Sequence, residues 1–174
     1  MDFLSKLEIS KNTIIRRAIF AALVLLTFVF QNTGGLFPAP AGIHAILLIP
    51  LTVCISMFER EFAGIFYGLA AGAMLDAFSS DSICFNSMIF TIIGFAAGAL
   101  ITYLMRNNLV CAAILTAFFT LVYNTLCFLL YSAFNGEPRP LHTYFRYFFL
   151  SVIYTCIFTP LYYFIVREIS KKLK

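Results

Sequence analysis

Six apolar runs follow one another along the chain, and short polar or proline-rich stretches separate them. An α-helix needs about 20 mainly apolar residues to cross the hydrocarbon core of a bilayer. Because most charges fall between the runs, we predict one membrane-spanning helix in each run. The predicted spans cover approximately residues 14–33, 43–58, 62–78, 86–105, 109–134 and 144–166.

The two ends of the chain are polar. Residues 1–13 form a mildly amphipathic segment, which we expect on the cytoplasmic surface of the membrane. Residues 167–174 form a basic tail. Inside the second run, Pro50 predicts a kink or break, since proline removes a backbone donor from the helix.

The third run contains a regular row of glycines. Gly64, Gly68 and Gly72 recur every four residues, so they share one face of a helix, and Asp76 continues the same row. A glycine inside a soluble helix costs about 1 kcal/mol relative to alanine. A membrane helix gains from glycines because they let a neighbouring helix approach closely. The row therefore predicts a buried helix-packing face.

A second small-residue face occurs in the fourth run, at Gly94 and Gly98 with Ala97 between them. An antiparallel neighbour of the third run would place this face against the glycine row. We therefore expect the glycines of both runs to pack helices together.

Acidic residues flank the glycine row. Glu59 and Glu61 form a charged turn before it, and Asp76 ends it. A carboxylate within a membrane helix is costly unless it meets a polar partner. We expect Asp76 to be a hydrogen-bonding anchor for Asn86 or for Gln31 and its neighbour in the first run. A transport or catalytic role for these acids is the alternative.

The composition identifies an integral membrane protein. The chain is 61% hydrophobic and 11% charged, whereas about 25% of the residues in soluble domains are charged. Its net charge of +4 does not indicate nucleic-acid binding, because the basic residues flank the apolar runs and so report topology. Ten of them fall on one side of the predicted membrane and two on the other. Both termini are therefore predicted to be cytoplasmic.

The sequence contains no recognisable catalytic or metal-binding motif. Its five cysteines show no CxxC spacing and lie mostly in or beside apolar runs. His44 and His142 are isolated from any matched set of ligands. We expect a protein without enzymatic activity, metal or cofactor, formed by a single all-α polytopic membrane domain.

The order of these features along nearly the whole chain carries a resemblance. The features are a first run ending in FVFQNT (residues 28–33, with Gln31), a proline in the second run, the Glu59 and Glu61 turn, the row from Gly64 to Asp76, and a late run with Tyr154, Thr155 and Pro160. In this order the chain resembles the rod shape-determining protein MreD family of bacteria.

The resemblance implies a component of the cell-elongation machinery in the inner membrane, without chemistry of its own. Such a protein would bind the bitopic protein MreC and help couple MreB filaments to the enzymes of peptidoglycan synthesis. The implied six-helix fold is similar to that of the substrate-binding components of energy-coupling-factor vitamin transporters. A transporter component of this kind is therefore the alternative function, although few polar residues other than Asn124, Glu137, Arg146 and Tyr154 fall at the outer ends of the last three runs.

Overall fold

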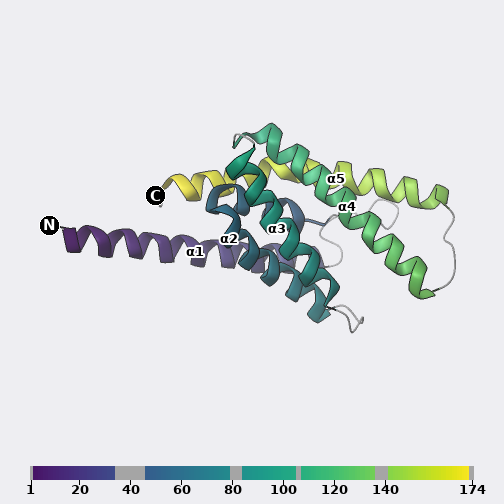
Figure 1. Ribbon diagram of the computed structural model, residues 1–174, viewed down its shortest axis with the longest axis horizontal. Helices are drawn as coiled ribbons and strands as arrows, with labels where there is room; N and C mark the ends of the chain where they lie inside the picture. Colours follow the sequence, from purple (N-terminus) through teal and green to yellow (C-terminus); the bar gives the residue numbers. More distant parts are fainter. Residues whose placement is uncertain (1, 34–45, 79–83, 105–106, 136–140, 173–174) are drawn as a thin grey trace.

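The described part of the chain is helical throughout and contains no strand. The computed structural model describes the backbone of residues 2–33, 46–78, 84–104, 107–135 and 141–172, and the side chains of these residues except 2–12, 130–135, 141–150 and 154. Its elements are α1 (Asp2–Asn32), α2 (Leu48–Phe78), α3 (Phe85–Tyr103), α4 (Leu109–Asn135) and α5 (Leu141–Lys172) (Figure 1).

The terminal helices extend beyond the predicted spans. The amphipathic segment predicted for residues 1–13 is, from Asp2 onward, the first part of the continuous helix α1. The basic tail likewise continues α5 as far as Lys172. The start of α1 and the end of α5 point toward the same end of the molecule (Figure 1), as expected for an even number of antiparallel helical segments.

The helix α2 consists of two segments that meet at Arg60, residues 48–59 and residues 61–78. Arg60 has φ of 71° and ψ of 177°, a conformation that residues other than glycine rarely adopt. In a continuous helix, Ser56 and Gly64 would lie about 12 Å apart along the axis. A Cβ atom on Gly64 would instead lie 2.5 Å from Ser56 Oγ. The chain therefore doubles back at Arg60, and the two segments lie side by side.

The break predicted at Pro50 is wrong. Pro50 lies in the first turn of α2, where backbone N–H groups have no acceptor within the helix. A proline at this position removes no helical hydrogen bond and so does not interrupt the helix.

The first segment of α2 is the centre of the core. Every residue from Leu48 to Met57 is buried. Thr52 and Ser56 lie within this stretch and donate their hydroxyl groups to backbone carbonyls one turn earlier, at 2.8 and 2.7 Å. The surrounding helices contribute fully buried side chains at Phe20, Val24, Phe90, Ile93, Ala112 and Val166.

Four of the described helical stretches are long and apolar enough to cross a membrane. They are Thr13–Asn32, Phe85–Tyr103, Leu109–Leu129 and Ser151–Lys172. The exposed side chains on these helices are largely apolar, including Leu25, Ile92, Phe118 and Leu161. This arrangement is that of a multi-pass membrane protein.

Candidate functional site

The glycine row lies directly against the backbone of α3. A Cβ atom on each glycine of the row would reach a carbonyl oxygen of α3 at a distance that real Cβ atoms do not adopt. The pairs are Gly64 with Gly94, Gly68 with Phe90, and Gly72 with Asn86. Each step of four residues forward on α2 is matched by four residues backward on α3, so the two helices pack antiparallel.

The glycines of α3 belong to the same contact. A Cβ atom on Gly94 would meet the carbonyl of Gly64, and one on Gly98 would lie 2.6 Å from the Cα atom of Glu61. Gly98 thus leaves space for the backbone where the chain doubles back at Arg60. The five glycines together form one interface in which two helix backbones touch.

Asp76 caps the beginning of α3. Its Oδ1 accepts the backbone N–H of Asn86 at 3.0 Å, and its Oδ2 accepts that of Ser87 at 2.8 Å and also the Ser87 hydroxyl. These N–H groups belong to the first turn of α3, where no acceptor exists within the helix. Cys84, which precedes the helix, makes no side-chain cap. The carboxylate of Asp76 therefore provides the missing cap from a neighbouring helix.

Gln31 caps the start of α2 in a similar way. Its side-chain Oε1 accepts the backbone N–H of Leu48 at 3.2 Å, and Leu48 is the first residue of α2. Close by, the rings of Phe28 and Phe78 lie 5.2 Å apart. Three parts of the chain therefore lie together here. They are the end of α1, the end of the second segment of α2 and the start of the first segment of α2.

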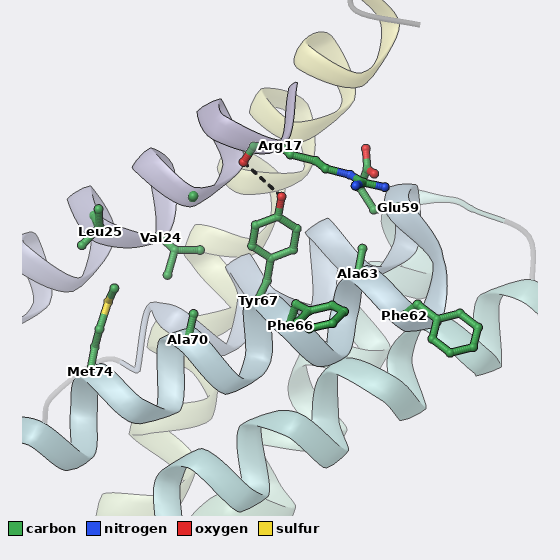
Figure 2. Close-up of a pocket in the computed structure, with 11 residues that line it drawn as sticks. Arg17, Val24, Leu25, Glu59, Phe62, Ala63, Phe66, Tyr67, Ala70 and Met74 are labelled. Atoms are coloured by element: carbon green, nitrogen blue, oxygen red, sulfur yellow. Dashed lines mark hydrogen bonds between the residues drawn. The ribbon is translucent and has the colours of Figure 1, made fainter. Parts of the chain in front are cut away.

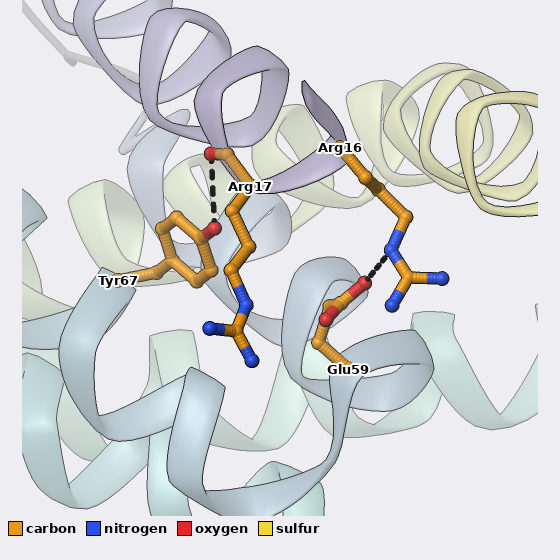
Figure 3. A network of polar contacts seen from close by, with 4 residues as sticks. All are labelled: Arg16, Arg17, Glu59 and Tyr67. Atoms are coloured by element: carbon orange, nitrogen blue, oxygen red, sulfur yellow. Dashed lines mark hydrogen bonds and ion pairs between the residues drawn. The ribbon is translucent and has the colours of Figure 1, made fainter. Parts of the chain in front are cut away.

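The opposite end of the bundle carries a group of charged residues, and we call it the charged end (Arg16, Arg17, Glu59, Arg60 and Glu61). Arg16 Nε lies 2.5 Å from Glu59 Oε1, and the Glu59 side chain is only 4% exposed. The Tyr67 hydroxyl donates to the backbone carbonyl of Arg17 at 3.0 Å. Figure 3 shows both bonds joining α1 to α2.

Other polar groups extend this pattern of bonds between helices. Glu61 Oε2 accepts the Thr102 hydroxyl of α3 at 3.1 Å, and the Tyr123 hydroxyl of α4 donates to Asn86 Oδ1 at 2.7 Å. The side chain of Tyr154, which the sequence also singled out, lies outside the described residues. Gln31, Glu59, Glu61 and Asp76 thus each join two helical segments.

Sequence reasoning missed several partners in these bonds. Arg16 was interpreted as a topology signal because it precedes an apolar run, and its position gives no sign of a buried acidic partner. Tyr67 and Tyr123 lie within apolar runs, and no motif marks either as a hydrogen-bonding partner. Ser87 could have been found from its position, because it lies at the start of an apolar run after a polar loop and follows the expected partner Asn86.

An apolar groove runs between α1 and the second segment of α2 (Figure 2). It has a volume of about 450 Å³ and is open to the outside of the bundle. Ala21, Ala63 and Ala70 line it with small side chains, while Phe66 projects beside it. Arg17 stands at one end of the groove, next to Tyr67.

The chemistry available in the described part of the chain is hydrogen bonding and apolar packing. Within these residues, no three His, Cys, Asp or Glu side chains lie close enough together to hold a metal ion. Asn124, one of the polar residues at the outer ends of the later spans, donates to Ser151 Oγ at 3.4 Å. This bond joins α4 to α5.

Comparison with known proteins gives one match. The family model described as rod shape-determining protein MreD matches residues 11–169. This range includes the whole glycine row, the charged end and the described stretches of α2 to α4. No curated protein and no solved structure matches the chain.

Proposed function

The chain belongs to the rod shape-determining protein MreD family and so has a role in determining rod shape, and we propose that it performs this role as a non-enzymatic membrane scaffold. In this proposal it binds a single-span partner resembling MreC. It thereby helps to connect MreB filaments with the enzymes of peptidoglycan synthesis in the cytoplasmic membrane.

The proposal rests on one observation: the acidic residues of α2 bond to other helices. Glu59 pairs with Arg16, Glu61 accepts from Thr102, and Asp76 accepts two backbone N–H groups of α3. A carboxylate that already holds two helices together is poorly placed to exchange protons with a substrate. These bonds favour a rigid framework whose outer apolar faces meet lipid and other membrane proteins.

The proposal includes six membrane crossings with both termini in the cytoplasm. Four crossings are the long apolar helices, and the two segments of α2 are the others. The charged end would then face the cytoplasm, in agreement with the excess of basic residues there. Six crossings would also match the helix number of the energy-coupling-factor components to which the sequence pointed.

The test combines depletion with recovery of the partner. After depletion, a rod-shaped host should widen or become round, and the wild-type chain should restore its shape. Affinity purification in mild detergent should recover an MreC-like single-span protein, and an unrelated multi-span protein with the same tag should not. Unchanged cell shape together with tight retention of a vitamin would contradict the scaffold and favour the transporter component.

A further inference from the structure

Aromatic contacts between α1 and the second segment of α2 hold the groove between these helices open. Midway along the groove the rings of Phe20 and Tyr67 lie 6.2 Å apart, and Tyr67 also bonds to the backbone of α1. Beyond the end of the groove away from Arg17, Phe28 meets Phe78. Large aromatic side chains therefore set the spacing of the helices, and the small alanines between them leave the space unfilled.

The groove is apolar along most of its length, and both Arg17 and Glu59 line it at the charged end. Phe62 and Phe66, which line it, are 74% and 70% exposed. Arg17 lines the same groove at the charged end (Figure 2). Because Arg16 pairs with Glu59, the charge of that carboxylate is already balanced. Among the described side chains, no carboxylate forms an ion pair with Arg17.

The size of the groove favours a thin occupant. The residues from Phe62 to Met74 that line it span about 18 Å along α2. A helix of ~10 Å diameter would fill roughly 1,400 Å³ over that length, more than the 1020 Å³ of empty space in the groove even when its open side is included. An extended hydrocarbon chain is much thinner than a helix. Its apolar surface could pack against the apolar walls of the groove.

We propose that this groove binds an anionic phospholipid, with an acyl chain along Ala21, Ala63 and Ala70 and the phosphate at Arg17. The guanidinium group matches two oxygens of a phosphate. Basic pockets between membrane helices are known to select anionic headgroups on the cytoplasmic side. The inference does not depend on the partner described above.

The first experiment measures lipid retention by native mass spectrometry in the presence of phosphatidylglycerol or phosphatidylcholine. The wild-type protein should retain one phosphatidylglycerol in preference to phosphatidylcholine. Arg17→Gln should reduce this preference about fivefold, the effect of roughly one basic residue at a membrane surface. Arg60→Gln removes a charge from the same end outside the groove and should leave the preference unchanged. Equal retention of both lipids by the wild type would overturn the proposal.

The second experiment tests the walls and identifies the occupant. Ala21→Leu narrows the groove and should lower phosphatidylglycerol retention, whereas Ala22→Leu, one residue away and outside the groove, should not. Phe66→benzoylphenylalanine should cross-link to a phospholipid in native membranes on illumination. A protein adduct at this position, or equal retention by the two alanine variants, would show that a lipid is not the occupant.

Discussion

At the residue scale, polar side chains of one helix supply the backbone groups that another helix leaves unpaired. The N–H groups in the first turn of a helix have no acceptor of their own, and within a membrane water is scarce. Asp76 meets this need for α3, and Gln31 meets it for α2. These two residues therefore fix where the following helices begin.

The bonds of Asp76 predict a graded response to substitution. Asp76→Leu leaves the N–H groups of Asn86 and Ser87 without this acceptor. Because both bonds are part-buried, we expect a cost at the lower end of the about 1–3 kcal/mol for an unpaired buried group. Asp76→Asn keeps one acceptor oxygen and should lose about half as much. Thermal unfolding in detergent measures both, with the exposed acid Glu168→Gln as a control expected to be neutral. Equal losses for Asn and Leu would instead show that the negative charge itself is required.

The sequence predicts the anchor at Asp76 better than it predicts the partners. A carboxylate at the end of a membrane helix must find a polar group, and this much follows from its position alone. Which group it finds depends on the residue at which α3 begins, because only the first turn of a helix has free N–H groups. The same limit applies to Glu59, whose partner Arg16 lies 43 residues earlier in the chain.

At the element scale, the pairing of α2 with α3 depends on backbone contact. The spacing of the glycines predicts the packing face of α2, but only Gly94 and Gly98 mark the facing surface of α3. Phe90 and Asn86 complete that surface with their carbonyl groups, and no small-residue pattern can identify them. The ring of Phe90 is directed to Tyr123, 5.7 Å away, and so leaves the contact free.

The backbone contact predicts that even a methyl group is too large in the glycine row. Gly68→Ala would bring Cβ against the carbonyl of Phe90, and overpacking of this kind costs about 1–3 kcal/mol. Gly68→Leu should be worse. Ala70→Leu, whose side chain faces the open groove, should be nearly neutral in the same thermal unfolding assay. Equal stability of all three variants would mean that α2 and α3 separate more easily than their contact indicates.

The sequence predicts a charged turn at Glu59–Glu61 between two spans, but it does not predict the backbone conformation of Arg60. The sequence Glu59–Glu61 contains no glycine or asparagine, the residues that usually adopt a positive φ. Pro50 gave the stronger signal of a break but falls in the first turn. The conformation at Arg60 is instead imposed from outside, because Arg16 holds Glu59 and Thr102 holds Glu61.

At the scale of the whole molecule, polar anchors at both ends hold an apolar bundle. Arg16 and Glu59 join the helices at the charged end, and Gln31 and Asp76 join them at the other. The apolar runs predict an all-helical membrane protein, and four of the described helical stretches are long and apolar enough to cross a membrane. Their contacts could not be derived, since α1 meets α2 through residues that look like ordinary lipid-facing positions in the sequence.

This arrangement predicts that the two ends of the bundle are accessible from opposite sides of the membrane. Cys84 is exposed just before α3, beside the Asp76 cap and far from the charged end. In a variant whose only cysteine is Cys84, an impermeant maleimide should label cells with a permeabilised outer barrier. Arg60→Cys in a cysteine-free background should be labelled only after lysis. The reverse pattern would contradict cytoplasmic termini.

The complete burial of residues 48–57 has a consequence for biogenesis. At about 18 Å, the first segment of α2 is shorter than the ~30 Å hydrocarbon core, so it is a weak insertion signal on its own. Its neighbour Tyr163, whose ring lies 5.5 Å from that of Phe58, belongs to α5, which is synthesised after α3 and α4. We therefore expect the segment to become fully buried only after α5 has been inserted. A chain truncated before α5 should expose this segment and be degraded faster than the full chain.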